Sequence, residues 1–511
     1  MSHPNQSVTD IERLLHTAGV DIHASSPKSG KTPGPKRRGP VRRFLQGFGW
    51  LVLRLLLCAA GVVALLGFRF TGTATDPINT PTSIRTVLPN TTVDPRIGIV
   101  DAFRAPSQAA TVPIGWERIL FWWKELQKDG PNSWDSFATN HDRQINQELS
   151  LGRHLAGALI NTPDWAAAQP SEHGTSPPKG LYLPYNDPNN YWGHFVGEMA
   201  KRYAGRIDDW IIWNEVNIPT GIWRTWAGSN ADYAQLVMVA YQAAKAANPH
   251  ARIVLAGDPY WYDHGAYFLD LIHRLTTAPG AQANQAYFDV VNLHLYSRPT
   301  EMQPIVDWYR NTMQNAGVLK PIWISETNAI PYDDTVRRYH RGGFLASLDD
   351  QASFMIQTFA IDLALDVQRF EVNRMLDGSD FASGGEPFGL VRNDGTVRPA
   401  FSAYRTAATL FAGTTSGTIQ HDSHTGVYTV TLQRPGATIT VLWDLKPAPA
   451  TVSLPVSSTV QFFDKFGQHP NVSVNGGRAT IQLAGATGNT NNADPADYVI
   501  GGNPVIVVQP T

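Results

Sequence analysis

Two glutamates each end an apolar run and are the residues of this chain best suited to acid–base and nucleophilic chemistry. Glu215 ends the segment DWIIWNE (209–215), and Glu326 ends the segment PIWISE (321–326). One carboxylic acid that donates a proton and one carboxylate that attacks as a nucleophile are together what cleavage of a glycosidic bond requires. A lone glutamate in such a place is more often part of an ion pair in a loop. Two glutamates in the same setting favour a catalytic pair.

Three more side chains of catalytic type lie on or beside similar runs. His294 and Tyr296 directly follow the run 289–293, and Arg118 lies within the run 116–121. A cation or a hydrogen-bond donor beside a carboxylate favours its ionised form. Each residue also has an ordinary structural explanation: a hydrogen-bonded buried histidine, a packed tyrosine, or an arginine paired with an acid in the core.

Aromatic residues are the other candidates for contact with a ligand. The indole of Trp165 can stack on a sugar ring, although packing in the core is the alternative for any single tryptophan. No group of histidine, aspartate or cysteine residues has the spacing of a metal site. We therefore expect neither a metal nor a cofactor.

Eight short β-rich runs alternate with helical patterns between about residue 95 and residue 410. The runs cover 96–100, 116–121, 155–161, 209–213, 252–257, 289–293, 321–325 and 369–375, and helical patterns cover 190–203, 233–247, 305–316 and 350–365. This alternation predicts an α/β fold, a closed (β/α)8 TIM barrel. An open doubly wound sheet is the alternative, but no run is followed by a glycine-rich nucleotide-binding loop. Because active sites of such barrels lie at the carboxyl ends of the strands, the candidate residues should share one rim.

The pattern changes after the barrel. Five β-like segments separated by turn-rich stretches cover 427–432, 438–443, 460–463, 479–483 and 505–508, and no helix-length pattern follows Thr414. This predicts a catalytic barrel over 95–413 followed by a small antiparallel β-sandwich domain over 414–511.

The segment before the barrel divides into three parts. Residues 1–43 are polar, contain prolines and become basic, which predicts a disordered tail. Residues 44–70 are apolar and long enough for a transmembrane helix, and 71–94 form a linker rich in threonine and proline. Seven basic residues lie between 28 and 43, directly before the apolar run, so the tail should be cytoplasmic and the catalytic domain extracytoplasmic in a single-pass protein of the cell membrane. A cleaved signal peptide is the alternative, but a 43-residue preface is long for one.

Charge and cysteine content exclude several classes of protein. The 511 residues include 41 Lys+Arg, 43 Asp+Glu and one cysteine, for a net charge of −2. A nucleic-acid-coating protein would be far more basic, and one cysteine excludes a disulfide framework. The charge is distributed unevenly along the chain. Residues 1–70 hold ten basic and three acidic residues, and the remaining residues hold 31 basic and 40 acidic ones. The predicted exported part is therefore acidic.

Three motifs together resemble those of clan A glycoside hydrolases, which are retaining (β/α)8 enzymes. They are Trp213-Asn214-Glu215, His294-x-Tyr296 and Ser325-Glu326. The resemblance covers roughly residues 95–410 and is greatest to family 39, which includes β-xylosidases and exopolysaccharide-cleaving endoglycosidases. The chain departs from the clan at Val216, where proline usually follows the acid/base, and at Met375, where the eighth run lacks a common tryptophan.

The resemblance implies a role for each matching residue. Glu215 would be the acid/base and Glu326 the nucleophile. The residues that would contact the sugar or the nucleophile are Asn214, His294, Tyr296 and Arg118. The implied function is that of a membrane-anchored retaining glycosidase acting on a poly- or oligosaccharide. A non-catalytic carbohydrate-binding or surface-assembly protein and an envelope-glycan transglycosidase are the alternatives.

Overall fold

The computed structural model describes residues 93–135, 142–221, 224–336, 346–378, 387–489 and 498–511. The predicted tail (1–43), the predicted membrane span (44–70) and nearly all of the predicted linker lie outside these ranges. Within them, every helix is too short or too polar to cross a membrane.

Eight parallel strands form the barrel, as the sequence predicted. They are β1 (Ile97–Ile99), β2 (Trp116–Trp122), β3 (His154–Ile160), β4 (Asp209–Ile212), β5 (Arg252–Leu255), β6 (Val291–His294), β7 (Ile322–Thr327) and β8 (Arg369–Val372). Their order is β5-β4-β3-β2-β1-β8-β7-β6, and isolated parallel bridges between Val254 and Val290 and between Asp258 and Leu293 close the ring. Several predicted bounds were wrong by two or three residues: β8 stops at Val372 rather than residue 375, and β5 stops at Leu255 rather than residue 257. β6 begins at Val291 rather than residue 289, and β7 continues to Thr327 rather than residue 325.

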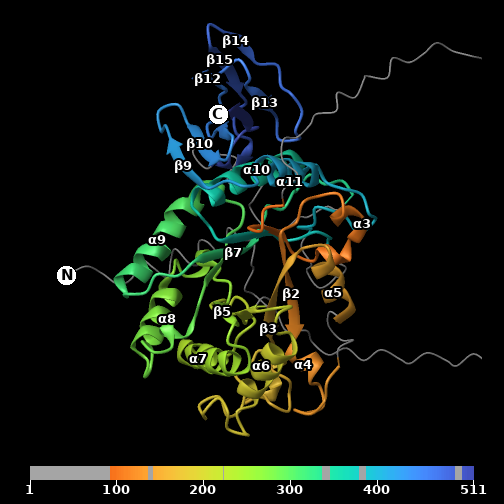
Figure 1. Cartoon of the computed structure of the whole chain (residues 1–511), viewed down its shortest axis with the longest axis vertical. Helices are drawn as coiled ribbons and strands as arrows, with labels where there is room; N and C mark the ends of the chain where they lie inside the picture. The colour runs from red at the N-terminus through yellow and green to blue at the C-terminus, as the bar shows by residue number, and fades with distance from the viewer. Residues whose placement is uncertain (1–92, 136–141, 222–223, 337–345, 379–386, 490–497) are drawn as a thin grey trace, which may run out of the picture. The chain divides into compact units, whose positions relative to one another are not determined.

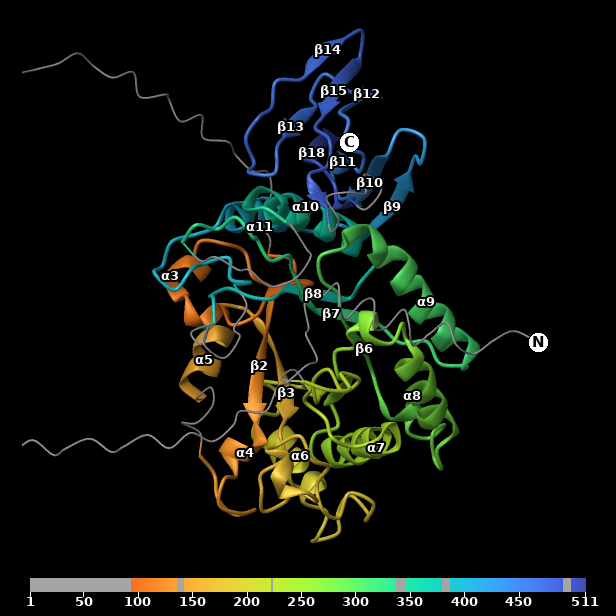
Figure 2. The ribbon, with the colours of Figure 1, turned by 180° about the vertical axis from the view of Figure 1, so that it is seen from behind.

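Helical segments follow each strand and surround the barrel (Figures 1 and 2). They are α3 (Pro106–Ala109), α4 (Trp123–Leu126), α5 (Asp142–Ser150), α6 (Tyr191–Arg202), α7 (Asn230–Ala247), α8 (Ala266–Thr277), α9 (Met302–Asn315), α10 (Leu348–Ala364) and α11 (Pro399–Leu410). A capping box starts α7, where Ser229 and Asp232 each bond the other's backbone N–H, and a second one starts α10. These reciprocal bonds satisfy N–H groups that the helix leaves without partners and so fix where it begins.

Large side chains fill the inside of the barrel. Trp116 and Trp323, with ring centroids 5.2 Å apart, belong to a separate buried cluster with small and branched residues of β3, β4 and β5. Gly98 makes room for this layer, because a Cβ there would lie 2.5 Å from the Trp116 indole nitrogen. The barrel is therefore packed through its centre, which leaves the rims for chemistry.

The C-terminal part consists of antiparallel sheets. Its strands are β9 (Ser416–His421), β10 (Val427–Arg434), β11 (Ala437–Asp444), β12 (Ala450–Pro455), β13 (Gln461–Phe463), β14 (Ser473–Asn475), β15 (Arg478–Leu483), β16 (Gly488–Asn489), β17 (Tyr498–Ile500) and β18 (Val505–Pro510). One sheet has the order β13-β18-β11-β10-β9 and another the order β12-β15-β14, and they share a hydrophobic cluster. Gln357 of α10 exchanges two 3.0 Å hydrogen bonds with the backbone of Gly501, which joins these sheets to the barrel.

Candidate active site

The two glutamates singled out in the sequence meet at the carboxyl-terminal rim of the barrel. Glu215 lies in the loop after β4, and Glu326 is the fifth residue of β7. Their side chains are 18% and 13% exposed, so each carboxylate is largely shielded but reaches solvent. Together with His294, they present ligand-type atoms that all lie within 4.8 Å of one another. The two carboxylates are thus close enough to act on one bond.

His294 lies between the two carboxylates. Its Nδ1 is 2.8 Å from Glu215 Oε1 and 3.5 Å from Glu326 Oε2, and its Nε2 is 3.2 Å from Ser325 Oγ. The ring is fully buried and lies directly over Gly257, where a Cβ would come within 1.9 Å of Nε2. The histidine is therefore fixed in place by packing as well as by hydrogen bonds.

Both oxygens of Glu326 accept hydrogen bonds. Arg118 Nη2 donates to Oε1 at 2.5 Å, and the Tyr296 hydroxyl donates to Oε2 at 2.5 Å. Burial raises the pKa of Glu326, but His294, Arg118 and the Tyr296 hydrogen bond outweigh it and bring this pKa to about 2. Glu326 is therefore ionised at neutral pH.

Two residues behind this cluster were not identified from the sequence. Asn373 donates to the Tyr296 hydroxyl oxygen at 2.7 Å, which leaves that hydroxyl free to donate to Glu326. Glu371 is fully buried beside Arg118, with its Oε1 3.5 Å from Arg118 Nε. Burial raises the pKa of Glu371 well above its ordinary value, although Arg118 opposes this. When Glu371 is protonated and neutral, the positive charge of Arg118 interacts with the carboxylate of Glu326 rather than with that of Glu371.

The loop that carries Glu215 turns sharply after β4. Trp213 and Glu215 both have left-handed backbone conformations, with φ of 72° and 44°. The Trp213 indole N–H donates to the carbonyl oxygen of Thr225 at 2.9 Å, and the Glu215 N–H donates to the carbonyl oxygen of Gly257 at 3.2 Å. Non-glycine residues adopt such conformations where the surrounding contacts demand them. Asn214 lies between them, half-buried, with its carbonyl oxygen bonded to the Thr225 hydroxyl.

Trp165 belongs to a different group of side chains. Its indole N–H donates to the carbonyl oxygen of Gln127 at 2.6 Å, and its ring packs edge-on against Trp123 and Tyr191. The ring is half-buried in the loop after β3. Its proposed contact with a sugar stays a prediction.

Glu215, His294 and Glu326 also have the composition of a metal-ligand set, but the contacts of Glu326 do not fit one. Glu326 already accepts a bond from a cation at one oxygen and from a hydroxyl at the other. The guanidinium of Arg118 would repel a metal ion placed on the same carboxylate. The cluster fits a carboxylate held in readiness for attack better than it fits a metal site.

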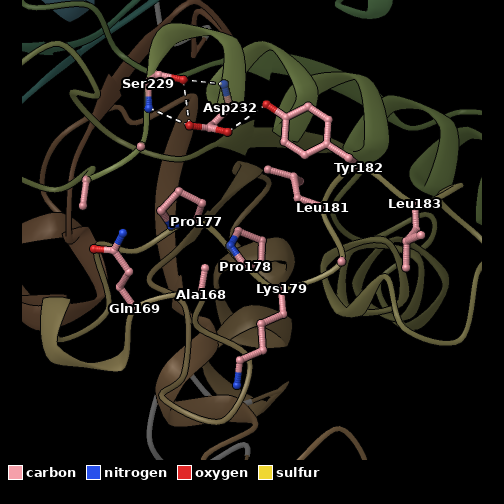
Figure 3. A pocket seen from close by; sticks show the side chains of 13 residues that line it. Ala168, Gln169, Pro177, Pro178, Lys179, Leu181, Tyr182, Leu183, Ser229 and Asp232 are labelled. Carbon is pink, nitrogen blue, oxygen red and sulfur yellow. Dashed lines mark hydrogen bonds between the residues drawn. The ribbon is translucent and has the colours of Figure 1, made fainter.

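The rim beside Glu215 is hollowed. A cavity of about 410 Å³ begins at Val216 and Asn217, and a cavity of about 490 Å³ lies beyond it; Gly228 lines both. Figure 3 shows the second one, where the Tyr182 hydroxyl donates to Asp232 at 2.8 Å. The Tyr182 side chain is 64% exposed, so its ring is presented to solvent in a fixed position.

Solved structures share this barrel, whereas no protein-family model and no curated protein matches the chain. A family 39 glycoside hydrolase from Bacteroides cellulosilyticus WH2 matches with a TM-score of 0.61 and 13% identity, covering 81% of both chains. The catalytic domain of GH30 xylanase C from Talaromyces cellulolyticus matches with a TM-score of 0.53 and 14% identity over 83% of this chain and 98% of its own. A monomeric β-xylosidase from Caulobacter crescentus CB15 matches with a TM-score of 0.51 and 14% identity over 81% of this chain and 95% of its own. The chain thus has the fold of these glycoside hydrolases, including the family that its motifs resemble.

Proposed function

We propose that this protein is a retaining glycoside hydrolase in which Glu326 is the nucleophile and Glu215 the acid/base. The observation that carries the proposal is the unequal setting of two neighbouring carboxylates. Glu326 is held ionised by Arg118 and Tyr296, whereas Glu215 lacks a cationic partner of that kind among the described residues and bonds to His294. A double displacement requires one carboxylate ready to attack and a second that carries a proton.

The spacing supports retention of configuration. Retaining glycosidases place the two carboxyl groups about 5–5.5 Å apart, whereas inverting enzymes keep them about 6.5–9.5 Å apart to admit a water molecule. Atoms of Glu215 and Glu326 within 4.8 Å of each other agree with the shorter spacing.

The mechanism follows from these positions. A Glu326 oxygen attacks the anomeric carbon while Glu215 gives its proton to the glycosidic oxygen, so the C–O bond breaks and the alcohol leaves. Glu215, now ionised, then takes a proton from water, whose oxygen attacks the anomeric carbon and releases Glu326. Tyr296 and Arg118 keep Glu326 ionised for the first step and stabilise it as the leaving group in the second.

A poly- or oligosaccharide is the substrate class that we propose. The cavity that begins at Val216 and the one beyond it offer room for sugar units beyond the one that reacts, and the exposed Tyr182 ring offers a face on which a sugar can stack. The xylanase and β-xylosidase among the structural neighbours act on sugars of this kind. Asn214, His294 and Trp165 are the further residues that we propose to contact the substrate.

Attachment to the cell membrane through residues 44–70 is part of the same proposal. It is supported by the length of this apolar run and by the basic residues before it. The barrel would then act outside the cytoplasm.

A glycan panel and one variant test the function. The full-length protein in neutral detergent should release sugar from at least one polymer, and Glu326→Ala should abolish turnover without changing the circular dichroism spectrum. A 2-fluoro glycoside with a good leaving group should label Glu326 in the wild type. Undiminished turnover in Glu326→Ala would refute the assignment. Absence of label and turnover would favour a non-catalytic carbohydrate-binding protein, and transfer to an added sugar acceptor would identify a transglycosidase.

A further inference from the structure

A third cavity, of unusual composition, lies away from the two glutamates. It has a volume of about 650 Å³, and the side chains of Arg96, Arg252, Arg310, Lys320 and Arg369 line it together with a single carboxylate, that of Asp366. We call it the basic cavity. Residues 71–511 are acidic as a whole, with 31 basic and 40 acidic residues, so this concentration of positive charge is a local feature.

The basic cavity lies at the amino-terminal rim of the barrel. Arg252 and Arg369 are the first residues of β5 and β8, Arg96 directly precedes β1, and Lys320 lies two residues before β7. Parallel strands all begin at one end of a barrel and end at the other. The cavity is therefore on the opposite end from Glu215 and Glu326 and is not part of the proposed catalytic centre.

The positive charges of the cavity are incompletely neutralised. Asp209 forms ion pairs with both Arg252, at 2.6 Å, and Arg369, at 2.9 Å. Both guanidinium groups also lie over the ring of Trp323, 5.5 Å and 4.8 Å from its centroid. Burial lowers the pKa of Arg369, and the charge of Arg252 adds to this while Asp209 opposes it. The single negative charge of Asp209 therefore faces two guanidinium groups, which leaves an excess of positive charge at this wall of the cavity.

Arg96 is neutralised by Asp94, which accepts from its guanidinium at 2.9 and 2.7 Å, whereas Lys320 and Arg310 add to the excess. The acid that most influences Lys320 is Asp289, which already pairs with Lys245 at 3.0 Å, and burial together with the Lys245 charge lowers the pKa of Lys320. Arg310 has its carboxylate partner, Asp307, at 3.9 Å, the outer limit of an ion pair. An anion in the cavity would relieve repulsion among these groups.

We propose that the basic cavity binds a phosphate group, as a free phosphate ester or as the headgroup of an anionic lipid. Several guanidinium groups around one space suit a tetrahedral dianion or a phosphodiester, because each guanidinium offers forked N–H donors that match phosphate oxygens. The chain enters the barrel through Pro95 and Arg96, both on the cavity wall. Phosphate bound here would hold the amino-terminal rim against a phosphate-bearing surface and turn the catalytic rim away from it.

Titration of the full-length protein in neutral detergent micelles tests this site. One arm adds sodium phosphate, with sodium chloride at equal ionic strength as its reference, and follows the midpoint of thermal unfolding. The other arm adds phosphatidylglycerol to the micelles, with phosphatidylcholine as its reference. Lys320→Glu should weaken phosphate binding at least about tenfold and Lys320→Gln less, because charge reversal removes the attraction and adds repulsion. Arg478→Glu is the matched control, since Arg478 is exposed on β15.

The outcomes separate the possible ligands. A response to phosphate that Lys320→Glu weakens and Arg478→Glu leaves unchanged supports the site with the phosphate group itself as ligand. A response confined to phosphatidylglycerol, with the same dependence on Lys320, supports it with a lipid headgroup as ligand. A wild type that responds in neither arm, or a Lys320→Glu protein that folds and binds as tightly as the wild type, overturns the proposal. None of these readings depends on glycosidase activity, so they stand or fall apart from the proposed function.

Discussion

Replacing Tyr296 by phenylalanine should move the acid limb of the pH–activity profile upward. The change deletes the 2.5 Å hydrogen bond to Glu326 Oε2 and leaves the ring that packs on Phe388. A hydrogen bond to a charged group contributes about 1.5–3 kcal/mol, and 1.36 kcal/mol corresponds to one pKa unit, so the pKa of Glu326 should rise by about one to two units. From a value of about 2, this places it at about 3–4.

The direction follows from the role of the ionised form. In the proposed mechanism Glu326 attacks only as a carboxylate, so kcat/KM should fall as the pH drops through the pKa of Glu326 in the free enzyme. In the wild type kcat/KM should fall near pH 2. In Tyr296→Phe the fall should move up to about pH 3–4, where circular dichroism can show that the protein is still folded.

The assay measures kcat/KM for an aryl glycoside of the preferred sugar from about pH 3 to about pH 7, with circular dichroism at each pH. Tyr404→Phe is the control, because Tyr404 is fully buried and its hydroxyl donates to the carbonyl oxygen of Pro113 at 3.2 Å, away from the rim. Identical acid limbs in Tyr296→Phe and the wild type would show that this hydroxyl does not stabilise the nucleophile, and the reasoning would fail.

Two further predictions concern acid groups of the same rim. Glu215→Ala removes the proton donor, so it should slow hydrolysis of substrates with poor leaving groups by about 10²–10⁴-fold and affect a dinitrophenyl glycoside much less; equal losses would exclude Glu215 as the acid. Burial raises the pKa of Asp258 from 3.8 to about 7 despite the 2.6 Å bond from Tyr309. The folded state therefore binds more protons than the unfolded state between these values, and wild-type stability should fall by up to about 4 kcal/mol as the pH rises through this window. Asp258→Asn should lose the part of this pH dependence that comes from Asp258 and keep the part that comes from other buried acids with raised pKa values, such as Glu371. A pH dependence as large as that of the wild type would contradict the shift.

The barrel and its principal carboxylates could be predicted because parallel strands are buried on both faces. Such strands read as continuous apolar runs, and a polar residue at the end of one is conspicuous. The segment before Glu326 and the segment before Glu215 are of this kind, and the topology then brings their ends to one rim. The convergence of His294, Arg118 and the two glutamates followed from strand order alone.

The rest of the site depends on contacts that the sequence pattern does not report. Asn373 was missed because the eighth run was extended to Met375, which places Asn373 inside the strand, whereas the strand stops at Val372 and Asn373 reaches Tyr296. Glu371 was missed because a glutamate inside a strand suggests a solvent-facing position, whereas here it is fully buried beside an arginine. Burial of an acid is a property of the packed barrel.

Several strands of the C-terminal sheets escaped prediction for a related reason. β9 and β12 are rich in threonine and serine and have one face exposed, so their apolar content is low. Each is a strand because its backbone pairs with a neighbour, β9 with β10 and β12 with β15. A pattern of side chains does not report such pairing.

The contact between Gly257 and His294 restricts which amino acids can replace the glycine at position 257. The chain keeps its fold at 13% identity to its structural neighbour over 81% of its length, so most positions tolerate replacement. Position 257 is different, because every other amino acid carries a Cβ, and a Cβ there would overlap the imidazole at 1.9 Å. A lineage that lost this glycine would have to move the histidine that links the two glutamates. Because any Cβ at position 257 would displace His294, a substitution of Gly257 would change the arrangement of the two glutamates as well as the local packing.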